Sequence, residues 1–144
     1  MGQHVLVPVD GSSQSEKAFK YALNELPDAQ ITLVHVLKMT TPWAYGGDES
    51  FDLEGYRDEQ ERRRKNAEAM LEELKDEASA HGGPIDTKLV VGGAANGILE
   101  TAEDHDVDHI VMGSHGRSGV GRVLFGSVAE TVTRRSTVPV TIVR

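Results

Sequence analysis

Apolar and polar positions along the chain follow two alternating patterns. Short runs rich in valine, isoleucine and leucine are typical of buried strands, and the segments between them repeat apolar residues every three or four positions, as helices do. The runs predict strands at Val5–Val9, Ile31–Leu37, Ile85–Val91, Val107–Met112 and Val138–Val143. The periodic segments predict helices at Ser13–Leu26, Gly55–His81, Ala95–Asp106 and Gly126–Arg135.

This regular alternation of strand and helix predicts an α/β fold. Such chains form a doubly wound parallel sheet with helices on both faces and right-handed crossovers. With 144 residues, the chain is expected to be one domain spanning residues 1–144. Ser13 and Glu16 indicate a capping box at the start of the first helix.

Composition excludes several classes of function. With 23 acidic and 15 basic residues the net charge is −8, which disfavours nonspecific binding to nucleic acid. The chain has no cysteine, so thiol catalysis and disulfides are excluded. No apolar run approaches the roughly 20 residues of a membrane span, and the N-terminus lacks the basic and apolar regions of a signal peptide. We therefore expect a cytoplasmic protein with no membrane partner.

A glycine-rich run near the C-terminus carries the main candidate chemistry. Gly113, Gly116 and Gly126, followed by Ser127, lie between the fourth predicted strand and the last predicted helix. Glycine lets the backbone approach an anion closely, and the unpaired N–H groups of a helix start attract negative charge. The run therefore indicates a phosphate site, although a flexible loop with capping glycines would have the same composition. It is neither a Walker A motif nor a dinucleotide fingerprint.

Two residues of the first predicted strand and turn support a site at the same edge of the sheet. Ligands of such sheets bind beyond the carboxyl ends of the strands, where strand order switches. Asp10 ends the first strand and could accept hydrogen bonds from ribose hydroxyls or simply cap the first helix. Pro8 cannot donate to a strand ladder, so either the strand end is deformed beside a ligand or pairing stops there.

Two further features each allow two interpretations. The irregular segment 39–54 contains Trp43, Tyr45 and Phe51, which either form a lid or, as we favour, pack against the long helix. His105 and His109 are four residues apart, but the predicted helix ends between them, which argues against a shared metal ion.

Several polar side chains complete the candidates. Arg117 and Arg122 lie within the glycine-rich run and could pair with phosphate charge, although Arg122 could equally be solvated. His35 alternates with inward-facing strand residues, which indicates a structural role. The mixed charges of Arg57–Lys65 are typical of a solvated helix face.

The chain resembles the universal stress proteins over its whole length. The resemblance rests on VLVPVDGS at the N-terminus, LVHV in the second strand, IVMGSHGRSG and the closing VPVTIV. The spacing Gly113-x-x-Gly116, nine residues, then Gly126-Ser127 is similar to the signature of the ATP-binding subclass. The resemblance implies the strand order 3-2-1-4-5, which places the first and fourth strands side by side.

The resemblance also implies residue roles in a nucleotide site. Asp10 would bind the ribose, and Val36 would offer backbone groups to the adenine. The residues after the fourth strand would wrap the ribose and α-phosphate, and the start of the last helix would hold the outer phosphates. The full implied set is Pro8, Val9, Asp10, Val36, Met112, Gly113, Ser114, His115, Gly116, Arg117, Gly126, Ser127 and Val128.

The function that the resemblance implies is an ATP-dependent regulatory switch in a stress response. No general base or nucleophile is evident, so hydrolysis is expected to be slow or absent, and any Mg²⁺ would be held through the phosphates. ADP, AMP or a cyclic nucleotide could replace ATP. An adenine-nucleotide hydrolase and a nucleotide-free dimerisation module are the competing functions. We also expect an unknown protein partner and a homodimer formed through Val138–Val143.

Overall fold

A computed structural model describes residues 3–38, 52–115 and 126–144. The described helices and strands follow one another in strict alternation, as the sequence predicts. In chain order they are β1 (His4–Pro8), α1 (Ser13–Glu25), β2 (Gln30–Leu37), α2 (Leu53–Glu77), β3 (Ile85–Val91), α3 (Ala94–Asp104), β4 (His109–Gly113), α4 (Ser127–Arg135) and β5 (Val140–Val143).

The strands form one five-stranded sheet in the order β3-β2-β1-β4-β5. Each neighbouring pair is parallel. This confirms the predicted α/β class and the strand order 3-2-1-4-5. The order reverses between β1 and β4, so the switch point lies between the carboxyl ends of these two strands.

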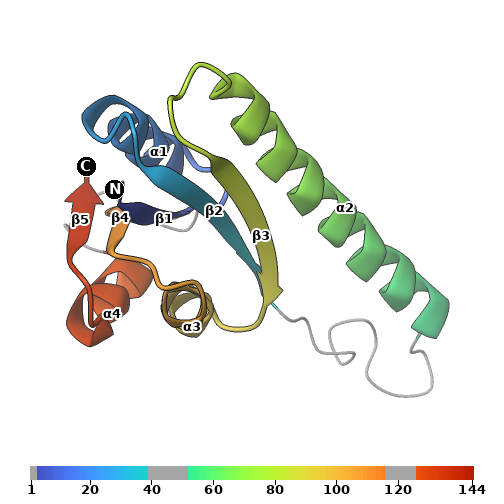
Figure 1. The fold of residues 1–144 in the computed structure, drawn as a ribbon. Coiled ribbons are helices and arrows are strands. Elements are labelled where there is room, and N and C mark those ends of the chain that lie inside the picture. The colour runs from blue at the N-terminus through green and yellow to red at the C-terminus, as the bar shows by residue number, and fades with distance from the viewer. Residues whose placement is uncertain (1–2, 39–51, 116–125) are drawn as a thin grey trace.

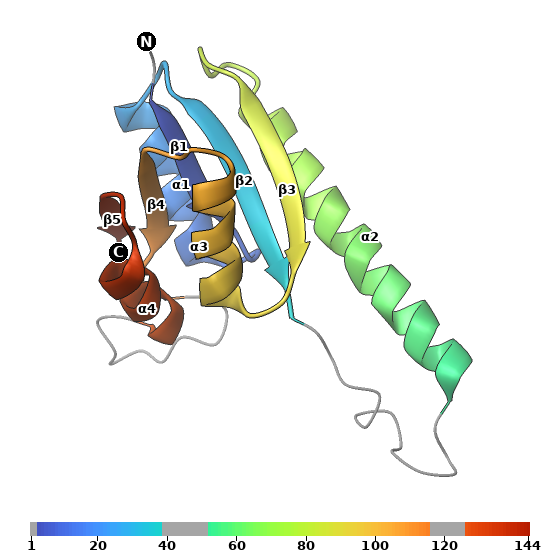
Figure 2. The ribbon, with the colours of Figure 1, turned by 60° about the horizontal axis from the view of Figure 1, so that its bottom comes forward.

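Helices cover both faces of the sheet, α1 and α2 on one side and α3 and α4 on the other (Figures 1 and 2). Successive side chains of a strand point to opposite faces. Val5 and Val7 of β1 accordingly pack in the α1 and α2 layer, whereas Leu6 packs in the α3 and α4 layer. All three side chains are fully buried, so the central strand is held from both sides.

Local hydrogen bonds move two strand starts from their predicted positions. Val107 donates its N–H to the Ala102 carbonyl at the end of α3, so β4 begins at His109. Val138 is tied into a turn by the Ser136 hydroxyl, which both accepts from and donates to its backbone. As a result, β5 begins at Val140.

The predicted capping box at Ser13 and Glu16 is wrong. The N-cap of α1 is Ser12, whose side chain accepts a hydrogen bond from the Ser15 N–H at 3.1 Å. Ser12 has extended backbone angles, as an N-cap residue requires. The helix itself starts where the sequence predicts, at Ser13.

Helix α2 has two dissimilar halves. Its buried residues, Ala67, Leu71 and Leu74, all lie toward the C-terminal end. The half containing Arg57–Lys65 has no buried side chain, which confirms the predicted solvated face. Arg64 pairs with Glu61 and Glu68 there, and its hydrogen bond lowers the pKa of Glu61. Figure 1 shows these turns extending past the end of β3.

Of the helices that the structure describes, none combines the length and apolar character needed to cross a bilayer.

Candidate functional site

The pairing of β1 with β2 and the pairing of β1 with β4 end at different residues of β1. On the β2 side it continues to Pro8, which is level with Val34. On the β4 side it stops at Leu6, which is level with Ile110. Beyond Leu6 the ladder between β1 and β4 is therefore open at the switch point, the place where ligands of such sheets bind.

Proline explains this asymmetry. Val9 donates its N–H to the Val34 carbonyl of β2 at 2.8 Å. Because successive residues of a strand direct their N–H groups to opposite neighbours, the missing N–H of Pro8 lies on the β4 side. Pro8 thus ends pairing with β4 without disturbing pairing with β2, and of the two interpretations of this residue the structure supports the arrest of pairing.

The alternation in β2 directs the Val36 backbone toward this crevice. The Val34 carbonyl accepts from Val9 on the β1 side, whereas the Leu37 carbonyl accepts from Gly92, which follows β3. Residues at even positions of β2 thus bond toward β1. The N–H and C=O of Val36 face the same side, two residues beyond the last β1 pair.

Asp10 lies in the turn from β1 to α1 and is half-buried. Its Oδ1 accepts the Ser12 N–H at 2.9 Å, and its own N–H donates to the Ser15 hydroxyl at 3.3 Å. Gly11 between them has a φ of +82°, a conformation suited to glycine. Asp10 therefore orders the turn but is not the helix cap, which is Ser12.

The carboxyl end of β4 is closely packed. Ser114 is 1 % exposed; its N–H donates to the Val143 carbonyl at 3.0 Å, and its hydroxyl lies 3.0 Å from Nδ1 of His115. A Cβ on Gly113 would lie 2.9 Å from the Gln14 carbonyl oxygen in the first turn of α1. The close approach that Gly113 permits is thus to the backbone of α1. Met112 is buried in the α3 and α4 layer.

The start of α4 meets the end of β4. Gly126 donates its N–H to the Ser114 carbonyl at 2.6 Å and is the N-cap of α4, with no side-chain capping bond. Ser127 is exposed and Val128 half-buried. The first N–H groups of this helix are therefore not satisfied by a capping side chain, and with the helix dipole they form an environment that favours anions.

Several predicted site residues lie outside the described part of the chain. These are Gly116, Arg117 and Arg122, together with Trp43, Tyr45 and Phe51 of the proposed lid. The structure therefore tests neither the phosphate-loop interpretation of the first three nor the packing of the aromatic side chains.

The histidines make separate contacts. His105 caps the end of α3, whereas His109 begins β4 and bonds Thr141 of β5 through Nε2. Within the described ranges no three His, Asp or Glu residues gather as metal ligands would. His35 bonds the Val9 carbonyl through Nδ1 at 2.7 Å. The alternation of β2 predicted only a structural role for His35, and this contact beside Asp10 is the feature that the pattern did not reveal.

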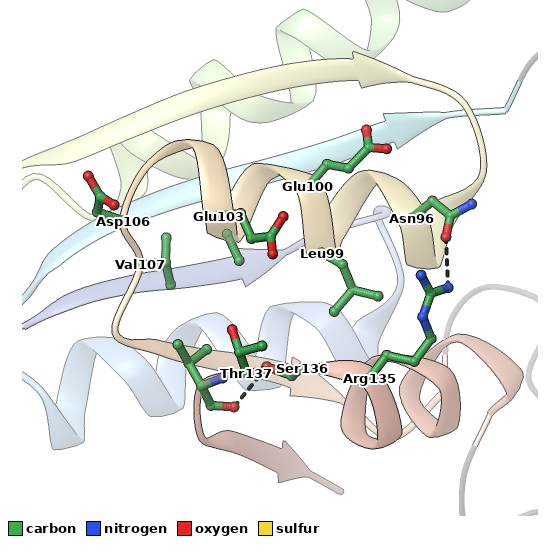
Figure 3. A pocket seen from close by; sticks show the side chains of 11 residues that line it. Asn96, Leu99, Glu100, Glu103, Asp106, Val107, Arg135, Ser136 and Thr137 are labelled. Carbon is green, nitrogen blue, oxygen red and sulfur yellow. Dashed lines mark hydrogen bonds between the residues drawn. The ribbon is translucent and has the colours of Figure 1, made fainter.

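A separate groove of about 640 Å³ lies between α3 and α4. Figure 3 shows its labelled side chains, including the bond from Arg135 to Asn96 at 2.9 Å. Glu100, Glu103 and Asp106 contribute to its lining, and their carboxylates would repel a polyphosphate. None of its lining residues belongs to the crevice between β1 and β4. The complete lining is Asn96, Leu99, Glu100, Ala102, Glu103, Asp106, Val107, Arg135, Ser136, Thr137 and Val138.

Comparison with known proteins places these features in a family. The chain is 32 % identical to Universal stress protein MJ0531 of Methanocaldococcus jannaschii over 142 residues, covering 97 % of this chain and 81 % of that protein. It superposes on the solved structure of the hypothetical protein MJ0577 with a TM-score of 0.82 and 30 % identity, covering 99 % of this chain and 96 % of the other.

A universal stress protein solved in complex with cAMP is also similar. It has a TM-score of 0.65 and 29 % identity, with coverage of 99 % of this chain and 97 % of that one. The profile of the Universal stress protein family matches residues 1–144. The open switch point, the uncapped α4 and the sheet order therefore occur in a chain that belongs to the universal stress protein family.

Proposed function

We propose that this protein binds an adenine nucleotide in the crevice between β1 and β4 and acts as a nucleotide-dependent regulatory switch. The observation that carries the proposal is the early end of β1–β4 pairing at Leu6, next to the uncapped N-terminus of α4. The relative that was solved with cAMP supports adenine nucleotides as the class of ligand.

The described residues suggest how the parts of a nucleotide would be held. The Val36 backbone would pair with the base beside Pro8 and Val9, and Asp10 would accept hydrogen bonds from the ribose. The N–H groups that follow Gly126 would contact the phosphates. By resemblance to the family, we assign Gly113–Arg117 to the walls of the ribose and α-phosphate site.

Because the protein is acidic overall, binding of a polyphosphate would depend on local groups that attract negative charge. At a net charge of −8 the protein as a whole repels a polyphosphate, so binding would depend on backbone N–H groups, on the α4 dipole, on Arg117 and on any magnesium ion carried by the phosphates. Among the described residues, no three potential ligands gather to hold such an ion through the protein alone.

The proposed role is regulation rather than rapid hydrolysis. Tight binding of ground-state phosphates does not accelerate a reaction, so the proposed contacts imply nucleotide occupancy rather than turnover. ATP occupancy would be sensed by a partner, and turnover would be slow or dependent on that partner. A hydrolase that acts on adenine nucleotides is the competing function.

We further propose a homodimer through the C-terminal strand. Among the described strands, β5 pairs only with β4 and forms an edge of the sheet, and exposed edges can pair with a second chain. Sedimentation should then show a dimer, and a monomer at tens of micromolar would contradict this part of the proposal.

Titration calorimetry tests the main proposal. The purified protein is titrated with ATP, ADP, AMP and cAMP, and with GTP as a control for the base, each with and without Mg²⁺. We expect measurable binding of at least one adenine compound and weaker binding of GTP. Mass spectrometry of copurified small molecules identifies the native ligand. Absence of binding for every adenine compound would reject the site, and turnover of several ATP per second would favour the hydrolase.

A further inference from the structure

Val9, the residue that follows β1, is held by a histidine side chain from β2. Nδ1 of His35 lies 2.7 Å from the Val9 carbonyl oxygen. Because a carbonyl can only accept a hydrogen bond, Nδ1 must carry the proton in this contact. Val9 also donates its N–H to the Val34 carbonyl at 2.8 Å. Both backbone groups of Val9 are thus bonded to β2.

The bond from His35 compensates for the backbone hydrogen bond to β4 that Pro8 cannot make. Pairing between β1 and β4 has already ended at Leu6, and the backbone bonds described for Val9, which follows β1, both run to β2. Strands bonded to a single neighbour twist more than strands bonded on both sides. The imidazole of His35 adds a second bond from the same neighbour and restricts that twist.

Asp10 is the residue that such a restriction would orient. It follows Val9 directly, and its bonds to Ser12 and Ser15 tie it to the first turn of α1. Asp10 therefore lies between Val9, which is bonded to β2, and the first turn of α1. Loss of the His35 bond would leave Val9 with the bond to Val34 alone, so the backbone that leads into Asp10 would be held less tightly.

We propose that His35 is a positioning residue that sets the selectivity of the nucleotide site for ribose over 2′-deoxyribose by holding Val9, and through it Asp10. The inference rests on the proposed function, since it assumes that Asp10 receives the ribose hydroxyls. His35 does not contact the nucleotide in this proposal.

His81 provides a matched control. Its Nε2 lies 2.7 Å from the Ala29 carbonyl oxygen, so the bond has the same length and the same kind of acceptor. Ala29 precedes β2 at the amino edge of the sheet, whereas His35 lies near the carboxyl end of that strand. Both histidines are half-buried. Loss of either bond should lower stability alike, but only one lies beside the crevice.

The experiment compares His35→Leu, His35→Asn and His81→Leu with the wild type. Affinities for ATP and 2′-deoxy-ATP are measured by calorimetry, and the melting temperature is measured by scanning calorimetry. The loss of one positioned hydrogen bond corresponds to a decrease in affinity of roughly five- to tenfold. For His35→Leu we expect ATP to bind about that much more weakly and 2′-deoxy-ATP to change little, so the ratio of the two affinities falls.

The controls distinguish positioning from general destabilisation. Asn carries an N–H donor close to the place of Nδ1, so His35→Asn should recover most of the selectivity. His81→Leu should melt earlier but keep the wild-type ratio. Should His35→Leu fail to fold, His35→Gln, whose donor lies one carbon farther out, should show the same loss of selectivity.

Failure of the inference and failure of the proposed function give different results. If the wild type selects ribose and His35→Leu keeps the same ratio, the inference is overturned and the proposed function stands. The same follows if His81→Leu lowers the ratio equally. A wild-type protein that binds no adenine nucleotide overturns both.

Discussion

The edge of the sheet formed by the amino ends of the strands (the amino edge) and the edge formed by their carboxyl ends (the carboxyl edge) differ in how their polar groups are bonded. At the amino edge, His4 uses both ring nitrogens: Nδ1 bonds the His105 carbonyl at 3.0 Å and Nε2 bonds the Thr32 hydroxyl at 2.7 Å. The His4 N–H donates to the Asp108 carboxylate at 2.9 Å. These bonds link β1 to β2 and to the residues that precede β4.

At the carboxyl edge, the same strands separate. Pairing with β4 ends at Leu6, the Val36 backbone faces the gap, and α4 starts without a side-chain cap. Buried backbone groups in proteins are almost always satisfied. Among the described residues, the amino edge completes these bonds within the chain, whereas the carboxyl edge is where we propose that a ligand binds.

The largest change in stability should come from adding a side chain at Gly113, where the end of β4 packs closely against α1. In Gly113→Val, the Cβ would lie 2.9 Å from the Gln14 carbonyl oxygen and 3.0 Å from its carbon. Since these are backbone atoms that cannot rotate away, we expect a loss of about 2–3 kcal/mol in the free energy of unfolding. Urea unfolding measures it, with Gly113→Ala expected to lose less. Wild-type stability in both variants would show that α1 is not packed on this edge.

The fold could be predicted because its signals are local and repeated. Val5, Val7 and Leu6 are apolar on consecutive positions, as a strand buried on both faces requires, and Ala67, Leu71 and Leu74 repeat at helical spacing. The predictions that were wrong concern the exact ends of the helices and strands. The turn at Val138 depends on the Ser136 hydroxyl, and a serine in sequence does not reveal which backbone group it will bond.

The site could be predicted only in outline. The positions of Asp10 and Gly113 at strand ends follow from the alternation of elements, and their proximity followed once the resemblance supplied the strand order. The contact from His35 to Val9 joins residues 26 positions apart, and it depends on the register of β1 against β2. Likewise, Gly113 reads as an anion-binding glycine, yet its neighbour in the structure is α1.

The next effect in size concerns two aspartates that make similar bonds at opposite edges. Asp10 accepts the Ser12 N–H and Asp108 accepts the His4 N–H, each at 2.9 Å. In Asp10→Ala, ATP affinity should fall roughly tenfold to a hundredfold, because hydrogen bonds to a charged group contribute about 1.5–3 kcal/mol. Calorimetric titration of both variants measures this.

Asp108→Ala is the control for that comparison. It should lose a comparable amount of stability, about 1 kcal/mol, while its ATP affinity stays at the wild-type value. If both variants bind ATP as the wild type does, Asp10 is not part of the site. If both weaken it equally, the two edges are not functionally distinct.

The smallest expected effect is a pH dependence that belongs to the amino edge. His109 begins β4 and lies beside Thr141, and burial lowers its pKa from the usual value of 6.5. The unfolded chain therefore takes up this proton at a higher pH than the folded chain does. Stability is lost as the pH falls from 6.5 toward the pKa of His109 in the folded protein. Below the folded pKa this contribution to stability no longer changes with pH. Denaturant unfolding at pH values on both sides of this window should show the wild type losing more stability on acidification than His109→Gln.

The same pair of proteins tests whether the two edges are independent. ATP affinity should show no difference between the wild type and His109→Gln at any of these pH values, because the carboxyl edge contains none of the groups involved. His109 and the open crevice lie at opposite ends of β4, so only a shift of the strand itself could connect them. A His109→Gln variant with an altered affinity would mean that the two edges communicate through β4.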